Sequence, residues 1–100
     1  MTTDLQGKCA VITGGGRGIG RGIALALAAR GCHVAINYFR HREEAEQTAA
    51  AAEQFGGRAV VVKAHVGREE EIQALVHESA SVLGSVDIFV GNAASGILKP

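Results

Sequence analysis

A glycine-rich stretch near the start of the chain has the composition and spacing of a phosphate-binding loop. TGGGRGIG spans residues 13–20, follows the apolar run CAVI and contains five glycines. Backbone N–H groups at the start of a helix bind phosphate, and glycine lets the ligand approach them. Gly14, Gly18 and Gly20 give the spacing T-G-x-x-x-G-x-G, which differs from the G-x-G-x-x-G fingerprint, and no P-loop G-K-[ST] follows. A tight turn without a ligand is the alternative interpretation of the glycines alone.

Cationic side chains follow the second apolar run, where the 2′-phosphate of a dinucleotide would be recognised. Proteins that bind NAD usually place an acidic residue about 20 residues beyond the loop, where it holds the ribose hydroxyls. Here the second apolar run continues as AINYFRHRE, which supplies Arg40, His41 and Arg42, while Arg17 lies in the glycine loop. Because guanidinium groups bind phosphate and a carboxylate repels it, the sequence favours NADP(H) over NAD(H). Alternatively, Arg40 and Arg42 are solvated at a helix entry, with Arg42 paired to nearby glutamates.

These residues must be positioned by alternating strands and helices. Short apolar runs at residues 9–13, 33–37, 59–64 and 86–90 lack an in-out alternation, which is typical of strands buried on both faces. Helical patterns fill residues 18–30, 43–55 and 69–83 between them. The order predicts an α/β layered fold with parallel strands and right-handed crossovers. In the first helix, Ile19, Ile23, Ala26, Leu27 and Arg30 follow the spacing of an inward face.

The length, charge and composition of the chain exclude several classes of function. One hundred residues allow one small domain, and ten basic and ten acidic residues give a net charge of zero, so no nucleic-acid partner is indicated. No apolar run approaches the roughly 20 residues of a membrane helix, and MTTDLQGK lacks the features of a signal peptide, which predicts a cytoplasmic protein. Cys9 and Cys32 are expected to be buried, reduced thiols. The four histidines do not have metal-ligand spacing, so no metal site is predicted.

The motifs together resemble the short-chain dehydrogenase/reductase family. TGGGRGIG is similar to the family's T-G-x-x-x-G-[IL]-G loop, and GNAAS at residues 91–95, preceded by SVDIFV, resembles its N-N-A-G motif. AINYFR, VVKAHVG and FVGNAASGILKP look most like NADPH-dependent enoyl-acyl carrier protein reductases of fatty acid biosynthesis and their 3-oxoacyl reductase relatives. The resemblance implies hydride transfer from NADPH to a carbonyl or an enoyl thioester, in a full-length parent that is a homo-oligomer.

The resemblance also implies a fold and a set of cofactor contacts. It implies a Rossmann-type doubly wound parallel sheet, of which residues 1–100 supply the first four strands in the order 3-2-1-4 with three helices. This part would be the dinucleotide-binding part of a single domain whose catalytic half is absent. The implied contacts are Gly14, Arg17, Gly18, Ile19 and Gly20 to the phosphates and ribose, Arg40 to the 2′-phosphate, Asn92 and Ala93 on the adenosine-ribose side, and His65 with Val66 beside the adenine.

The chain departs from the family pattern at several places. His65 stands where the family usually has Asp, so the adenine amino group would lose a carboxylate acceptor, although a neutral imidazole nitrogen can accept one hydrogen bond. Gly91 and Ala94 replace the first Asn and the Gly of N-N-A-G. The family's catalytic Ser, Tyr and Lys lie further along a full-length member, and neither Tyr38 nor Ser95 matches them. We therefore predict no catalytic residue here, and a chain that is inactive alone.

Two other functions are open at this stage. The first is a truncated nucleotide-binding module without catalysis. The second is a Rossmann-like methyltransferase fragment that binds S-adenosylmethionine. The second alternative predicts an acidic residue at the end of the second strand to hold the ribose, where the sequence has Asn37 and Tyr38.

Overall fold

The computed structural model describes residues 4–92, which form an α/β layered structure with seven elements. Their order along the chain alternates strand and helix as predicted. The elements are β1 (Cys9–Ile12), α1 (Gly18–Ala29), β2 (His33–Tyr38), α2 (Arg42–Glu53), β3 (Ala59–Lys63), α3 (Glu69–Leu83) and β4 (Ile88–Val90). No helix in this described part is long and apolar enough to cross a membrane.

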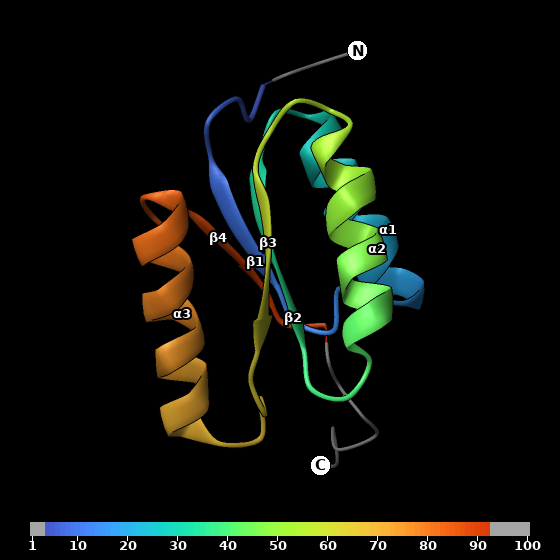
Figure 1. Cartoon of the computed structure of the whole chain (residues 1–100). Helices are drawn as coiled ribbons and strands as arrows, with labels where there is room; N and C mark the ends of the chain where they lie inside the picture. Colours follow the sequence, from blue (N-terminus) through green and yellow to red (C-terminus); the bar gives the residue numbers. More distant parts are fainter. Residues whose placement is uncertain (1–3, 93–100) are drawn as a thin grey trace.

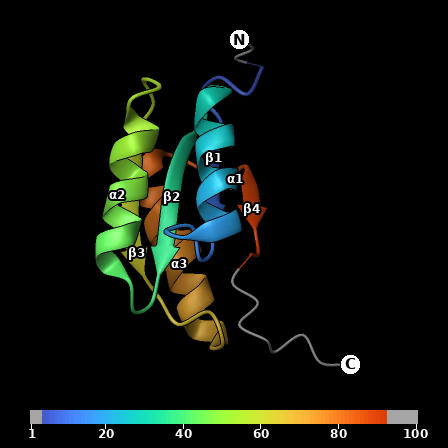
Figure 2. The ribbon, with the colours of Figure 1, turned by 90° about the vertical axis from the view of Figure 1, so that its right-hand side faces the viewer.

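The strands pair in parallel in the order β3-β2-β1-β4, which confirms the predicted topology. Helices α1 and α2 cover one face of the sheet and α3 covers the other (Figures 1 and 2). Alternate residues of β1 therefore enter two different cores: Ala10 and Ile12 face α1 and α2, whereas Cys9 and Val11 face α3. Burial on both faces explains why the strand sequences are apolar without alternation.

Helix α1 meets the sheet through its smallest residues, and the predicted inward face is confirmed only in part: Ile23 and Leu27 pack against the core, whereas Ile19 does not. Gly20, Ala24 and Ala28 are buried, whereas Ile19 is 76% exposed. The reason is a close approach, because a Cβ on Gly20 would overlap the carbonyl oxygen of Gly14. Only residues with little or no side chain fit so near the β1–α1 loop, and larger apolar residues such as Leu27 pack at the margin of this core.

The other two helices agree better with their patterns. In α2, Ala45, Ala49 and Ala52 are buried, but Phe55, the last residue of the predicted range, lies beyond the end of the helix and is 46% exposed. Helix α3 has the predicted bounds. Its buried residues are Leu75, Ser79 and Leu83.

Both cysteines are buried and free, as expected. Burial raises the pKa of the Cys32 thiol, so this side chain behaves as a small apolar residue. Asp87 has a structural place at the start of β4: it accepts hydrogen bonds from the backbone N–H of Cys9 at 2.9 Å and from the hydroxyl of Ser85 at 3.1 Å. These contacts tie the beginning of β4 to the beginning of β1.

Candidate cofactor-binding site

The glycine-rich loop joins β1 to α1 at the carboxyl end of the sheet (Figure 1). Arg17 precedes α1 in an extended conformation and makes no side-chain cap, and the first helical hydrogen bond is donated by Arg21 to the Arg17 carbonyl. Among residues 4–92, nothing accepts a hydrogen bond from the N–H groups of Gly18, Ile19 or Gly20. Uncapped N–H groups at the positive end of the helix dipole form an anion-binding arrangement.

Two glycines give this loop its shape and its access. Gly14 and Gly18 have φ angles of 62° and 53°, in the left-handed region that favours glycine. A Cβ on Gly18 would meet no atom within 4 Å, so the backbone there borders open space. The loop thus leaves the start of α1 open to a ligand. Because Gly20 has no side chain, the backbone of α1 can lie against the carbonyl of Gly14.

A buried amide side chain, Asn37, fixes the loop to the ends of two neighbouring strands. Its Oδ1 accepts a hydrogen bond from the N–H of Gly14 at 3.2 Å, and its Nδ2 donates to the carbonyls of Ala64 at 3.1 Å and Val62 at 3.3 Å. The Asn37 carbonyl also accepts from the N–H of Gly15. Sequence reasoning treated Asn37 only as the absence of an acid, and no local pattern identifies this bridging role.

A second asparagine, Asn92, braces the loop from the opposite side. Its backbone N–H donates to the hydroxyl of Thr13 at 2.7 Å, and its Nδ2 donates to the carbonyl of Gly14 at 3.4 Å. Asn92 follows β4, so this contact closes the loop onto the fourth strand of the sheet. Its neighbour Ala93, which the resemblance placed on the adenosine-ribose side, lies outside the described residues, as do Ala94 and Ser95.

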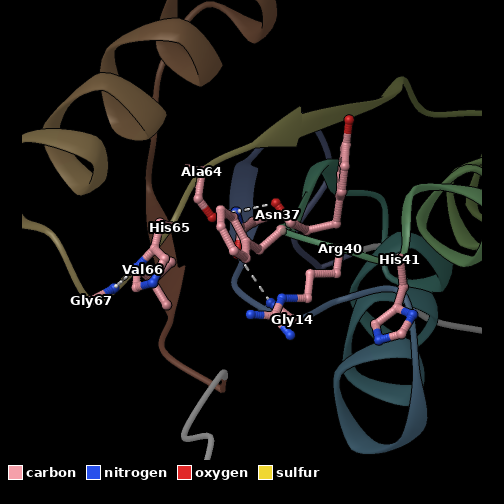
Figure 3. Close-up of a pocket in the computed structure, with 10 residues that line it drawn as sticks. Gly14, Asn37, Arg40, His41, Ala64, His65, Val66 and Gly67 are labelled. Atoms are coloured by element: carbon pink, nitrogen blue, oxygen red, sulfur yellow. Dashed lines mark hydrogen bonds between the residues drawn. The ribbon is translucent and has the colours of Figure 1, made fainter.

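A pocket of about 490 Å³ opens beside the loop, over the carboxyl ends of β2 and β3 (Figure 3). Figure 3 shows Arg40 on one side of this pocket and the segment 65–67 on the other. The pocket brings together four of the predicted contacts: Gly14, Arg40, His65 and Val66. Its lining residues are Gly14, Asn37, Tyr38, Phe39, Arg40, His41, Ala64, His65, Val66 and Gly67.

Phe39 is the centre of an aromatic and cationic cluster in this pocket. The His65 ring packs edge-to-face against it at 4.6 Å between centroids, and the guanidinium of Arg40 lies 5.7 Å from the Phe39 centroid. The ammonium group of Lys63, the last residue of β3, lies 5.9 Å from the same centroid. The sequence indicated Arg40 and His65 but neither Phe39 nor Lys63, because their proximity depends on the pairing of β2 with β3.

Hydrogen bonds orient His65 from two sides. Its Nδ1 accepts from the backbone N–H of Gly67 at 3.0 Å, and its own backbone N–H donates to Glu71 Oε1 at 2.6 Å. The Glu71 carboxylate also accepts from Arg68 at 2.9 Å. The His65 N–H and the Arg68 guanidinium lower the pKa of Glu71, so Glu71 is held as a carboxylate. Through this carboxylate, the first turn of α3 holds His65 in the wall of the pocket.

The other cationic side chains predicted near the phosphate lie in two places: Arg17 and His41 lie beside the glycine loop, whereas Arg42 lies at the solvated start of α2. Arg17 points to Glu44 at 3.7 Å, and His41 Nδ1 lies 3.3 Å from the same carboxylate. Arg17 and His41 also line a small cavity of about 80 Å³ beside the glycine loop. Arg42 instead bonds Glu46 at 2.8 Å on the surface of α2, as the helix-entry interpretation expected. The surface pair raises the pKa of Arg42 and keeps it out of the pocket.

A parallel sheet with an open helix start and a pocket over its second and third strands defines a nucleotide-binding protein of the Rossmann class. The family model described as "short chain dehydrogenase" matches residues 8–100. The chain belongs to this family, whose members are oxidoreductases that use nicotinamide cofactors, and the family resemblance inferred from the sequence is confirmed.

Several known proteins are similar to the chain. Tetrahydroxynaphthalene reductase of Pyricularia oryzae is 42% identical over 99 residues, which are 99% of this chain and 34% of that protein. Hydroxynaphthalene reductase arp2 of Aspergillus fumigatus is 43% identical over 96 residues, 96% of this chain and 35% of that protein. The chain thus spans about a third of the length of these relatives. The finer resemblance to acyl carrier protein reductases stays a prediction.

Solved structures support the same assignment. A short-chain dehydrogenase from Burkholderia cenocepacia in complex with NADP has a TM-score of 0.86 and 43% identity over 89% of this chain and 36% of that one. A dehydrogenase/reductase from Sinorhizobium meliloti has a TM-score of 0.87 and 41% identity over 92% of this chain and 36% of that one. The fold of residues 4–92 is therefore the Rossmann-type fold of this family.

Proposed function

We propose that this chain is the cofactor-binding part of an NADP(H)-dependent short-chain oxidoreductase. One observation carries the proposal: three uncapped N–H groups at the start of α1 adjoin a pocket that Arg40 flanks. The open backbone at Gly18 fits a diphosphate, because a ligand can approach it without meeting a side chain. The residues described here therefore fit a dinucleotide.

Each part of the cofactor has a place along this edge of the sheet. The N–H groups of Gly18, Ile19 and Gly20 bind the diphosphate, with Gly14 shaping the turn and Arg17 supplying charge beside it. The ribose of the adenosine half lies over the end of β2, and Arg40 binds its 2′-phosphate. The wall formed by His65 and Val66 contacts the base. Asn92 supports the loop from the β4 side, next to Ala93.

The preference for NADP(H) follows from the charges at the end of β2. Arg40 is exposed and lines the pocket, and its position follows a strand that ends without a carboxylate. The Asn37 side chain is turned inward, where Gly14, Val62 and Ala64 use its polar atoms, so it does not compete for the ribose hydroxyls. A phosphorylated ribose gains a charge-assisted hydrogen bond there that an unphosphorylated ribose lacks.

The reaction proposed for the whole protein is reduction of a carbonyl group or an enoyl thioester. The nicotinamide cofactor supplies the hydride, and the residues of this chain bind and orient it. The names of the naphthol reductase relatives support a reductase. No residue among 4–92 is assigned to proton donation, so the proposed reaction needs a donor from outside these residues. A cytoplasmic location for the enzyme stays an expectation from the sequence.

Calorimetric titration with NADPH, NADH and S-adenosylmethionine tests this function. We expect NADPH to bind, NADH to bind more weakly and S-adenosylmethionine not to bind. Arg40→Ala should weaken NADPH by about tenfold, the value of one charge-assisted hydrogen bond, and leave NADH within about twofold. Arg42→Ala is the matched control, because Arg42 is close to Arg40 in the sequence but bonds Glu46 on the surface of α2. Binding of S-adenosylmethionine alone, or equal losses for both dinucleotides, would contradict the proposal.

A further inference from the structure

The hydrogen bond between Gly67 and His65 determines which nitrogen of the imidazole carries the proton. A backbone N–H can only donate, so Nδ1, which accepts it at 3.0 Å, is unprotonated in the neutral ring. The proton of neutral His65 is therefore on Nε2. That nitrogen makes no hydrogen bond to any residue among 4–92, and the His65 side chain lines the pocket. His65 thus presents a donor where the sequence had suggested an acceptor.

A second donor lies next to it. Val66 lines the same pocket, and its backbone N–H makes no hydrogen bond within residues 4–92. The neighbouring N–H groups are used, because His65 donates to Glu71 and Gly67 donates to the His65 ring. The wall formed by His65 and Val66 at the end of β3 therefore offers two uncharged donors, the Nε2–H of His65 and the backbone N–H of Val66.

The edge of the nucleobase that meets this wall follows from the order of the pocket. The diphosphate belongs at the start of α1 and the ribose at the end of β2 beside Arg40, so the base extends to the end of β3. A purine is attached to its ribose through N9, so its far edge carries N1 and the 6-substituent. In adenine N1 is an acceptor and the 6-amino group is a donor, whereas in hypoxanthine N1 carries a proton and the 6-oxo group is an acceptor with two lone pairs.

We propose that His65 removes the usual selection for a 6-aminopurine, so that this site takes a 6-oxopurine dinucleotide at least as well as an adenine dinucleotide. The proposal rests on the proposed function, since it concerns the base of the same cofactor. Adenine satisfies one N–H of the wall through N1 and turns its amino group toward the other donor. In hypoxanthine the roles are reversed: the 6-oxo group accepts from one or both N–H groups, while N1–H pairs with neither. Each base therefore satisfies at least one of the two donors, and the wall no longer selects the amino group.

Nitrogen NMR tests the tautomer directly, without activity. In the long-range ¹H–¹⁵N spectrum at pH 8, we expect Nδ1 of His65 to show the shift of an unprotonated nitrogen and Nε2 that of a protonated one. His33 is an internal reference, because its Nδ1 accepts from the backbone N–H of Arg58 at 2.9 Å in the same way. The opposite assignment for His65 would overturn the proposal.

Calorimetric titration then compares NADPH with its deamino analogue, which carries hypoxanthine. For the unmodified chain we expect the analogue to bind within about threefold of NADPH or more tightly. His65→Asp supplies an acceptor and should favour NADPH by about tenfold, the effect of pairing one otherwise unpaired polar group. His65→Asn should keep the original pattern, because its Oδ1 can accept from Gly67 while its Nδ2 still donates. His77→Asp, on the exposed side of α3, is the matched control.

The outcomes separate this inference from the proposed function. If both dinucleotides bind and NADPH is favoured tenfold by the unmodified chain, the function stands and the role of His65 is refuted. If neither dinucleotide binds, the function and the inference fall together. A change of preference in His65→Asp but not in His65→Asn or His77→Asp supports the donor role, because loss of packing would affect both His65 variants.

Discussion

Replacement of the buried amide of Asn37 by alanine tests how the fold holds the glycine loop. Asn37 is 2% exposed, and its side chain makes four hydrogen bonds, to the N–H of Gly14 and to the carbonyls of Tyr38, Val62 and Ala64. Asn37→Ala leaves these groups without that partner, and an unsatisfied buried group costs about 1–3 kcal/mol. Because water can reach the part-buried Gly14 bond, we expect a loss of about 2–4 kcal/mol rather than the full sum.

Urea unfolding followed by circular dichroism measures this loss, with the slope m checked for two-state behaviour. Asn37→Asp is the informative second variant, since its carboxylate keeps an acceptor for Gly14 but turns another acceptor toward the carbonyls of Val62 and Ala64. It should also be destabilised at pH 7, and less so at low pH, where a protonated acid can donate. A loss below about 0.5 kcal/mol for Asn37→Ala at unchanged m would refute the bridging role.

Three further predictions concern separate parts of the chain. Ser79 has a buried hydroxyl without a partner among the described residues, so Ser79→Ala should raise the free energy of unfolding by up to about 1 kcal/mol in urea. The hydrogen bonds from Cys9 and Ser85 lower the pKa of Asp87, so its contribution is present at neutral pH and lost as pH falls through the folded-state pKa; Asp87→Asn should flatten that acid limb. Glu44→Gln should free Arg17 and strengthen NADPH binding up to about threefold at low salt, unlike Glu43→Gln.

The sequence was sufficient for the elements, their order and the position of the loop. Apolar strands without an in-out alternation, separated by helical patterns, predicted the alternating architecture, and the bounds of α3 were predicted without error. The strand order came from the family resemblance and is confirmed. These features depend on neighbours along the chain or on a shared motif, so they are visible before any tertiary contact is known.

The failures have two physical causes: close approach favours small residues over large ones, and contacts between strands depend on the register of their pairing. A search for large apolar residues chose Ile19 for the inward face of α1, but the helix is pressed so near Gly14 that Gly20 and Ala24 take that place. The contacts of Phe39 with His65 and Lys63 were missed because they require the register of β2 on β3. Such contacts join residues more than 20 positions apart, and no local pattern records them.

The hydrogen bonds that shape the loop stabilise the fold, whereas the charge that we propose selects the 2′-phosphate contributes nothing to the fold. Asn37 and Asn92 hold Gly14 from opposite sides through groups that are at least partly buried, so weakening either one should lower stability and cofactor affinity together. Arg40 is exposed and bonds no carboxylate among residues 4–92, so its removal should lower affinity without changing stability. Because a ligand at 100 times its Kd stabilises the folded state by about 2.7 kcal/mol, NADPH at matched saturation should raise the free energy of unfolding equally for the loop variants and for the Arg40 variant. The two kinds of variant therefore differ in the free energy of unfolding without ligand, which should be lowered in the Asn37 variant and unchanged in the Arg40 variant. A loss of stability without ligand in the Arg40 variant, or none in the Asn37 variant, would refute this division.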